Sequence, residues 1–156
     1  KKSLRYLWIA PTSALLDRCA KHLVSMLVPN GYVSLVPGVL SLVPIQNTGA
    51  AFSFFSGKTA MLTIISIILI AALSDALIFG SWQCASTLSI SGMWMMIGGG
   101  LGNLYDRIFH GSVFDFLRLD FVDFAIFNTA DMFIVLGAIF TCIGLLFERK
   151  QKEMNE

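Results

Sequence analysis

Residues 59–79 read TAMLTIISIILIAALSDALIF, and this stretch contains a single ionisable side chain, Asp75. A helix of about 20 apolar residues can cross the hydrocarbon core of a bilayer, where it satisfies its own backbone N–H and C=O groups. The chain as a whole has the same character, since 56% of its 156 residues are hydrophobic, 13% are charged and the mean hydropathy is +0.74. The composition therefore predicts an integral membrane protein.

Three further apolar stretches, about residues 4–28, 87–109 and 124–147, are also long enough to span a membrane. We expect one integral membrane domain over residues 1–156, an all-α protein built as a bundle of four transmembrane helices. The first stretch has no signal-peptide cleavage pattern, so we expect it to be retained as a span. The chain does not begin with Met, which favours a fragment or a processed form.

The orientation in the membrane follows from six cationic residues near the chain ends. An excess of Lys and Arg is typical of cytoplasmic flanks, and four spans place both termini on one side. We therefore expect both termini in the cytoplasm and the segments 30–57 and 110–123 on the extracytoplasmic side. The six residues are Lys1, Lys2, Arg5, Arg149, Lys150 and Lys152.

The segment between the first two spans is too long and too structured for a simple loop. Residues 32–55 read YVSLVPGVLSLVPIQNTGAAFSFF, in which β-branched and apolar residues are divided by Pro37, Gly38 and Pro44. Such short runs with turn residues between them are typical of strands. We expect a small extracytoplasmic β-sheet formed by about residues 30–57.

Several ionisable residues are predicted at membrane depth, where each costs roughly 2.5–3.5 kcal/mol on insertion scales. Asp17 and Lys21 are four residues apart, so they share a helix face and can form a structural ion pair. Arg18 points away from this pair and is expected to extend to the interface. Asp17, Lys21, Asp106 and Asp131 would also allow a small membrane transport or proton-relay protein, although the internal repeats common in transporters are missing from the sequence.

Two aspartates are expected to meet at the outer side of the bundle. Asp115 follows the third span, and Asp131 enters the fourth within FNTAD, residues 127–131. Two neighbouring carboxylates in a low-dielectric site cannot both ionise easily, so one pKa rises and the pair shares a proton. Such a pair can activate water as a base and protonate an amide as an acid. Asp120 and Asp123 are interpreted as solvated loop residues.

Four motifs occur in order along the chain: NTGAAFS (47–53), GGGLGNLYDR (98–107), VFDF (113–116) and FNTAD (127–131). With them the chain resembles the lipoprotein signal peptidases, or signal peptidase II, over nearly its whole length. The resemblance implies a membrane-embedded aspartic endopeptidase of the bacterial cytoplasmic membrane, with its active site near the extracytoplasmic face. It would cleave signal peptides from diacylglyceryl-modified prolipoproteins just before the lipidated cysteine.

The resemblance also implies roles for single residues, with Asp115 and Asp131 as the catalytic pair. By their chemistry we expect Asn47, Asn103, Arg107 and Asn128 to hold the pocket and the substrate backbone. The sequence departs from the family pattern near the rim, where Gln46 replaces an aromatic residue and residues 125–126, Ala and Ile, replace an aromatic–proline pair. The other motif positions are Gly99, Ala130, Asp17 and Lys21.

The expected partners are lipidated prolipoproteins and membrane lipids, and a monomer is expected. The net charge of +1 gives no reason to expect a nucleic-acid partner. The resemblance implies no cofactor. His22 and His110 are the two histidines and HExxH does not occur, so the sequence predicts no metal site.

Overall fold

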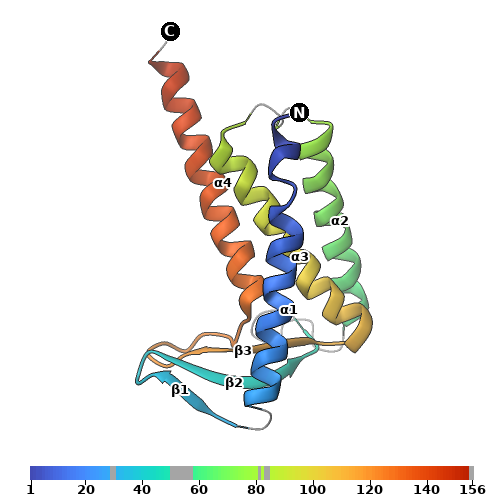
Figure 1. Ribbon diagram of the computed structural model, residues 1–156, viewed down its shortest axis with the longest axis vertical. Helices are drawn as coiled ribbons and strands as arrows, with labels where there is room; N and C mark the ends of the chain where they lie inside the picture. Colours follow the sequence, from blue (N-terminus) through green and yellow to red (C-terminus); the bar gives the residue numbers. More distant parts are fainter. Residues whose placement is uncertain (29–30, 50–57, 81, 83–84, 155–156) are drawn as a thin grey trace.

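The computed structural model describes residues 1–28, 31–49, 58–80, 82 and 85–154. Four α-helices stand side by side in this part of the chain, with a small sheet at one end of the bundle (Figure 1). The N-terminal segment and the C-terminal end of the last helix lie at the opposite end. The helices are α1 (Ile9–Leu27), α2 (Thr59–Ile78), α3 (Thr87–His110) and α4 (Thr129–Glu153), and a short 3-10 helix, η1 (Ser3–Tyr6), precedes α1.

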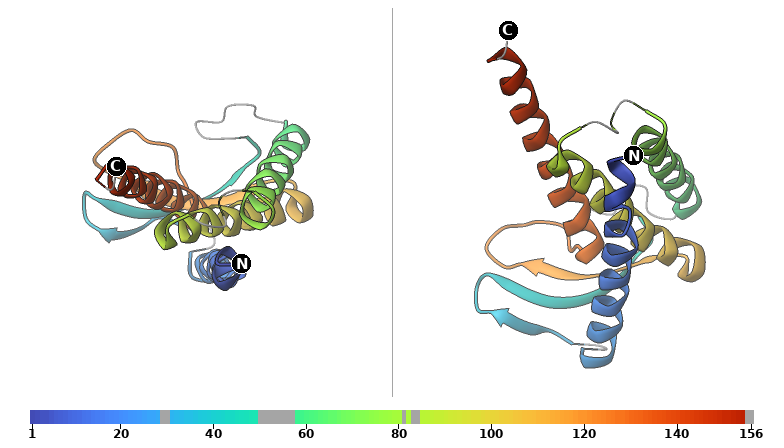
Figure 2. Two further views of the ribbon diagram at one scale, coloured as in Figure 1. Left: turned by 90° about the horizontal axis from the view of Figure 1, so that it is seen from above. Right: turned by 45° about the horizontal axis from the view of Figure 1, so that its top comes forward.

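Helix α3 lies at the centre of the bundle and packs against each of the other three helices (Figure 2). Its glycines permit this close packing, as the sequence GGGLG indicates. A Cβ atom at Gly99 would collide with the backbone carbonyl oxygen of Ala130 on α4. A Cβ atom at Gly98 would lie 2.5 Å from the carbonyl oxygen of Ala10 on α1. The two glycines therefore set the distances from α3 to the helices on either side.

The helices differ in how apolar their surfaces are. By length and composition, α2 and the Thr129–Lys150 part of α4 could each cross a membrane. Ile64, Ile68 and Leu69 on α2 are all more than half exposed, so this helix presents an apolar surface to its surroundings. In contrast, α1 and α3 bury polar side chains between them, among them Asp17, Lys21, Asn103 and Asp106.

The sheet has three antiparallel strands in the order β1 (Val33–Val36), β2 (Leu40–Asn47) and β3 (Val113–Leu119). The prediction of a sheet built from residues 30–57 alone was therefore incomplete, because β3 comes from the segment 110–123 between α3 and α4. Of the predicted range, residues 30 and 50–57 lie outside the described residues. Phe116 and Leu117 of β3 pack with Val24 of α1 in a small core that joins the sheet to the bundle.

Two predicted helix starts differ from the structure. The fourth span was expected from about residue 124, but α4 begins at Thr129. Phe127 instead pairs with β3, since Leu117 N–H donates to the Phe127 carbonyl at 2.8 Å and Phe127 N–H donates to the Leu117 carbonyl at 3.0 Å. The first span, expected from about residue 4, is divided into η1 and α1.

Candidate active site

Asp115 is held on β3 by two asparagine side chains. The sheet register places Ile45 opposite Asp115, so Asn47, two residues further along β2, is its diagonal neighbour on the same face. Asn47 Nδ2 donates to Asp115 Oδ2 at 2.8 Å, and Asn128 Nδ2 donates to Asp115 Oδ1 at 2.6 Å. Each carboxylate oxygen therefore accepts a hydrogen bond from an amide.

The Asp115 side chain is 3% exposed, and this burial raises the pKa of its carboxyl group to about 6. The hydrogen bonds from Asn47 and Asn128 act in the opposite direction, because they favour the ionised form. The nearby charge of Asp131 raises the pKa of Asp115, while that of Lys21 lowers it. Asp115 can therefore gain or lose a proton near neutral pH, which is useful for acid–base chemistry.

Asp131 is held by the start of α4 itself. Asn128 precedes the helix, and its Oδ1 accepts a hydrogen bond from the Asp131 backbone N–H at 3.1 Å. In return, Asp131 Oδ2 accepts from the Asn128 backbone N–H at 3.0 Å. This reciprocal arrangement is a capping box made by Asn and Asp in place of the more common Ser/Thr and Glu. It fixes the Asp131 side chain against the first turn of the helix.

The two aspartates are linked through Asn103 and Asn128. Asn103 Nδ2 donates to Asp131 Oδ1 at 2.8 Å, and Asn128 Nδ2, besides donating to Asp115, donates to Asn103 Oδ1 at 3.1 Å. The Asn128 side chain is completely buried. The amides thus bring side chains from β3, α3 and α4 together in one polar network.

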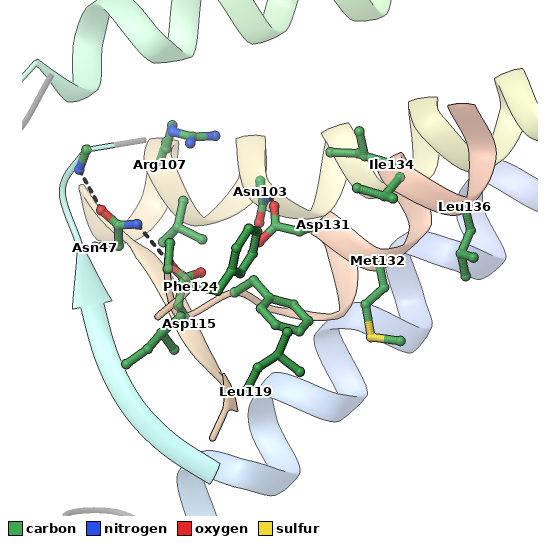
Figure 3. A pocket seen from close by; sticks show the side chains of 16 residues that line it. Asn47, Asn103, Arg107, Asp115, Leu119, Phe124, Asp131, Met132, Ile134 and Leu136 are labelled. Atoms are coloured by element: carbon green, nitrogen blue, oxygen red, sulfur yellow. Dashed lines mark hydrogen bonds between the residues drawn. The ribbon is translucent and has the colours of Figure 1, made fainter. Parts of the chain in front are cut away.

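Both aspartates line one cavity of about 520 Å³ (Figure 3). Its polar end is formed by Asn47, Asn103, Asp115 and Asp131, with Arg107 on the wall from α3. The cavity then continues between the 124–127 segment and α4, where its lining is apolar. These apolar residues are Leu119, Phe124, Ala125, Ile126, Phe127, Met132, Ile134, Val135 and Leu136.

A second buried network supports the first from the side of α1. Lys21 Nζ lies 2.8 Å from Asp17 Oδ2, as an ion pair, and donates to Asp106 Oδ2 at 2.7 Å and to Asn103 Oδ1 at 3.1 Å. Asp17 Oδ1 accepts from the Ala130 backbone N–H at 2.9 Å and from the Thr129 hydroxyl at 2.7 Å. Asp17 therefore satisfies donors at the N-terminus of α4, where a negative charge is favourable.

Two interpretations of single residues were wrong. Arg18 does not point away from the Asp17–Lys21 pair, because its NH2 group pairs at 2.6 Å with Asp106, to which Lys21 also donates. Asp120 is not simply a solvated loop residue, since it accepts from the Ser41 hydroxyl and, at 2.9 Å, from Arg118 Nε. Asp106 and Ser41 lie far from Arg18 and Asp120 in the sequence, so these two contacts depend on the fold, whereas Arg118 is only two residues from Asp120.

The structure brings together most of the residues singled out from the sequence. Asn47, Asn103, Arg107, Asp115 and Asp131 line the cavity. Asn128 lies behind it, bonded to Asp115, and Asp17 and Lys21 lie further back. Gly99 and the backbone of Ala130 are at the contact between α3 and α4, so they shape the site through packing.

Sequence reasoning missed the apolar half of the cavity. Residues such as Leu119, Met132 and Leu136 carry no motif and look like any other lipid-facing or core residue. The one available signal was the departure at Ala125 and Ile126, which do line the cavity. Within the described residues, no three His, Cys, Asp or Glu side chains are grouped so that they could hold a metal ion.

Known proteins resemble this chain in both sequence and structure. The family model described as signal peptidase (SPase) II matches residues 9–147. The lipoprotein signal peptidase of Streptococcus thermophilus (strain CNRZ 1066) is 38% identical over 125 residues, which cover 80% of each chain. The lipoprotein signal peptidase of Syntrophomonas wolfei subsp. wolfei is 38% identical over 143 residues, which cover 90% of this chain and 92% of that protein.

Two solved structures of bacterial membrane enzymes, both obtained by the in meso method, have the same fold. The one at 2.3 Å resolution has a TM-score of 0.83 and 28% identity, and the match covers 95% of this chain and 91% of that one. The one at 1.9 Å resolution has a TM-score of 0.79 and 29% identity. With the family model matched over most of its length, this chain belongs to the signal peptidase II family.

Proposed function

We propose that this protein is a membrane-embedded aspartic endopeptidase that removes signal peptides from lipid-modified prolipoproteins. The observation that carries the proposal is the pair Asp115 and Asp131, which line one cavity and are joined through Asn128 and Asn103. Membership of the signal peptidase II family supports peptide-bond hydrolysis, and the names of the relatives support lipoprotein precursors as substrates. The proton-relay alternative has no comparable support.

The proposed chemistry needs one carboxylate and one carboxylic acid. The carboxylate removes a proton from a water molecule as the water oxygen attacks the carbonyl carbon of the scissile peptide bond. The protonated partner gives its proton to the carbonyl oxygen, and a tetrahedral diol forms. When the diol collapses, the protonated carboxyl group gives its proton to the amide nitrogen as the C–N bond breaks, and one hydroxyl of the diol gives its proton to the other carboxylate, so the pair again holds one proton. A shared proton, with a pKa of about 6 for Asp115, supports both roles near neutral pH.

The apolar part of the cavity supports a lipidated substrate. Next to the two carboxyl groups, the lining changes from Asn and Asp to Phe, Leu, Ile and Met. A polar end can hold the peptide bond while an apolar groove accepts the acyl chains of the lipidated cysteine. We assign Asn47 and Arg107 to the substrate backbone beside the scissile bond, and Asn103, Asn128 and the Asp17–Lys21 pair to the support of the two aspartates.

The proposed topology places both termini in the cytoplasm, with the sheet and the two aspartates near the extracytoplasmic face of the bacterial cytoplasmic membrane. Two observations support it: the cationic residues cluster at the chain ends, and the sheet lies at the end of the bundle opposite those ends (Figure 1). In this orientation, a substrate anchored in the outer leaflet meets the dyad from the membrane while water enters from outside. We propose that a single chain, as a monomer, is sufficient, because α1, α3, α4, β2, β3 and the residue before α4, Asn128, supply all the residues assigned here.

The proposal is tested with purified protein in detergent and a synthetic prolipoprotein precursor, with and without diacylglyceryl on its cysteine. We expect cleavage of the lipidated precursor at the bond before the modified cysteine, identified by mass spectrometry of both products. Equal cleavage rates for the two precursors would contradict the lipid-binding role of the cavity. If neither precursor were cleaved, the result would contradict the proposed activity.

A further inference from the structure

We propose that Lys21 is a positioning residue for the dyad, and that it acts by fixing the side-chain amide of Asn103 with its NH2 group toward Asp131. This inference rests on the proposed function and extends it, since it gives the buried ion pair on α1 a role in the reaction. Lys21 touches neither aspartate of the dyad. Its contacts reach Asp131 through one intervening side chain.

The first step of the argument concerns which atom of Asn103 faces Lys21. An ammonium group can only donate hydrogen bonds, so a neighbour within hydrogen-bond distance must present an acceptor. Lys21 Nζ lies 3.1 Å from Asn103, and the atom it meets is therefore the amide oxygen, Oδ1. The Asn103 NH2 group is then on the other side, 2.8 Å from Asp131 Oδ1.

The second step concerns Asn128, whose orientation is fixed independently. Its Oδ1 accepts from the Asp131 backbone N–H at 3.1 Å, and a backbone N–H can only donate. The Asn128 NH2 group must therefore point away, toward Asp115 Oδ1 at 2.6 Å and Asn103 Oδ1 at 3.1 Å. Asn103 Oδ1 thus accepts from both Lys21 and Asn128, and the two donors agree on one orientation of the Asn103 amide.

The third step concerns what would happen if this orientation were lost. A reversed Asn103 would direct its carbonyl oxygen at Asp131 Oδ1 and its NH2 group at that of Asn128. Asp131 would then lose a donor and face a second acceptor, which is costly in a buried site. The hydrogen bond from Asn128 Nδ2 to Asn103 Oδ1 by itself already favours the observed orientation of the Asn103 amide. Lys21 adds a charge-assisted hydrogen bond, which is roughly twice as strong as a neutral one.

The surroundings of Lys21 keep its ammonium group in place. The side chain is 3% exposed, and Asp17 from α1 and Asp106 from α3 hold Nζ at 2.8 and 2.7 Å. Asp17 is itself bound to the Ala130 backbone N–H, one residue before Asp131. A lysine held on two sides by carboxylates, with its third contact on Asn103, is well suited to fix one amide.

Arg18 provides a matched control within the same cluster. It is also a cation of α1, and its NH2 group pairs with Asp106 at 2.6 Å. The hydrogen bonds of the Asn103 side chain in the described structure are with Lys21, Asp131 and Asn128, and none is with Arg18. Loss of Arg18 therefore removes a positive charge from Asp106 but leaves the amide of Asn103 bound to Lys21.

The main test variant is Asp17→Asn/Lys21→Met, compared with Asp17→Asn alone. The double variant removes Lys21 together with a carboxylate that would otherwise be buried without its partner. In the prolipoprotein assay we expect its kcat to be ~10–100-fold below that of Asp17→Asn, as for a misplaced catalytic group, with a KM within about threefold. Arg18→Met should retain the wild-type kcat.

The pH profile separates positioning from general stability. The charged groups that act on Asp115 are Asp131 from α4, Lys21 from α1 and Arg107 from α3; Asp17 and Asp106 face Lys21. The positive charge of Lys21 lowers the pKa of Asp115, so its removal should move the pH profile of kcat/KM to higher pH. A double variant with the kcat and the pH profile of Asp17→Asn would overturn the role of Lys21.

A second measurement needs no substitution at position 21. In protein labelled with ¹⁵N-asparagine, one side-chain amide proton of Asn103 should shift as the dyad titrates, because it is bonded to Asp131. An Asn103 amide insensitive to this titration would overturn the proposed orientation, even if the double variant failed to fold. Wild-type protein that cleaves no precursor would instead count against the proposed function, so the two failures are distinguishable.

Discussion

Asn128 performs two tasks, and two substitutions should separate them. Its Oδ1 caps α4, and its Nδ2 donates to Asp115 and Asn103. Serine is as good an N-cap residue as asparagine but is too short to reach Asp115. Asn128→Ser should therefore keep the cap and lose the hydrogen bonds to Asp115 and Asn103, whereas Asn128→Ala should lose the cap and these hydrogen bonds.

The expected magnitudes follow from these contacts. Loss of the cap costs about 1 kcal/mol, and loss of a hydrogen bond to a charged group costs roughly 1.5–3 kcal/mol. Asn128→Ala should thus be destabilised by roughly 2.5–4 kcal/mol, and Asn128→Ser by about 1 kcal/mol less. For a chain of this size, the Tm of Asn128→Ser should therefore be about 2–4 °C higher than the Tm of Asn128→Ala.

Activity should respond differently from stability. Both variants leave Asp115 Oδ1 without its hydrogen bond from Asn128, while Asn47 still binds Oδ2, so kcat should fall in both by a similar factor, on the order of 10². Because the Asn128 hydrogen bond lowers the pKa of Asp115, its loss should raise that pKa above its value of about 6 and move the pH–rate profile upward. The assay is cleavage of lipidated precursor between pH 5 and 8, with Tm measured on the same samples. Wild-type kcat in Asn128→Ser would refute the role of Nδ2, and equal Tm values would refute the cap.

Three further predictions concern stability, packing and topology. The pKa of Asp115 is raised from 3.8 to about 6, so its contribution to stability is complete below pH 4 and is lost as the pH rises through 6. At 1.36 kcal/mol per pKa unit this loss is roughly 3 kcal/mol. As the pH rises from 4 to above 6, the Tm of Asp115→Asn should therefore fall less than the Tm of the wild type. An equal fall in the two proteins would contradict the raised pKa. Gly99→Ala should lower the free energy of unfolding by about 1–3 kcal/mol, because its methyl group meets the backbone of α4. The control, Gly100→Ala, places its methyl group against a flexible isoleucine side chain only. Equal Tm values for the two variants would show that α3 and α4 can separate to admit the methyl group. In a background without native cysteines, Ser34→Cys should react with an impermeant maleimide added outside cells and Glu153→Cys should not, and the reverse pattern would invert the topology.

The helices were predictable because long apolar stretches allow few alternatives in a membrane. The predicted spans 59–79 and 87–109 nearly coincide with α2 and α3. The start of α4 was placed five residues too early, because residues 124–127 continue the apolar pattern. Backbone pairing of Phe127 with Leu117 keeps this residue out of the helix, and hydrophobicity does not reveal that contact.

The third strand was predictable in part. VFDFLRL, residues 113–119, contains Val and two Phe, which are enriched in strands, although neither polarity nor burial alternates regularly along it. The sequence analysis placed residues 110–123 on the extracytoplasmic side but assigned them no secondary structure. Its pairing with β2, however, joins residues about 70 positions apart, and only this pairing brings Asn47 to Asp115.

For the candidate site, helix spacing predicted faces but not partners. The spacing of Asp17 and Lys21 correctly suggested that they lie together, and their distance is 2.8 Å. That Lys21 also reaches Asp106 and Asn103 depends on how closely α1 and α3 approach, which the sequence does not specify. The apolar lining of the cavity could not be predicted for the same reason, since it is formed where β3, the 124–127 segment and α4 converge.

The most direct test of the proposed dyad is cleavage of lipidated precursor by Asp115→Asn and Asp131→Asn, each compared with wild type. An amide can neither remove a proton from water nor supply the shared proton, so each variant should lose at least about 10³-fold in kcat while remaining folded. Folding would be checked by circular dichroism and Tm in the same detergent. Substantial turnover by either folded variant would remove that aspartate from the reaction and contradict the two-aspartate mechanism.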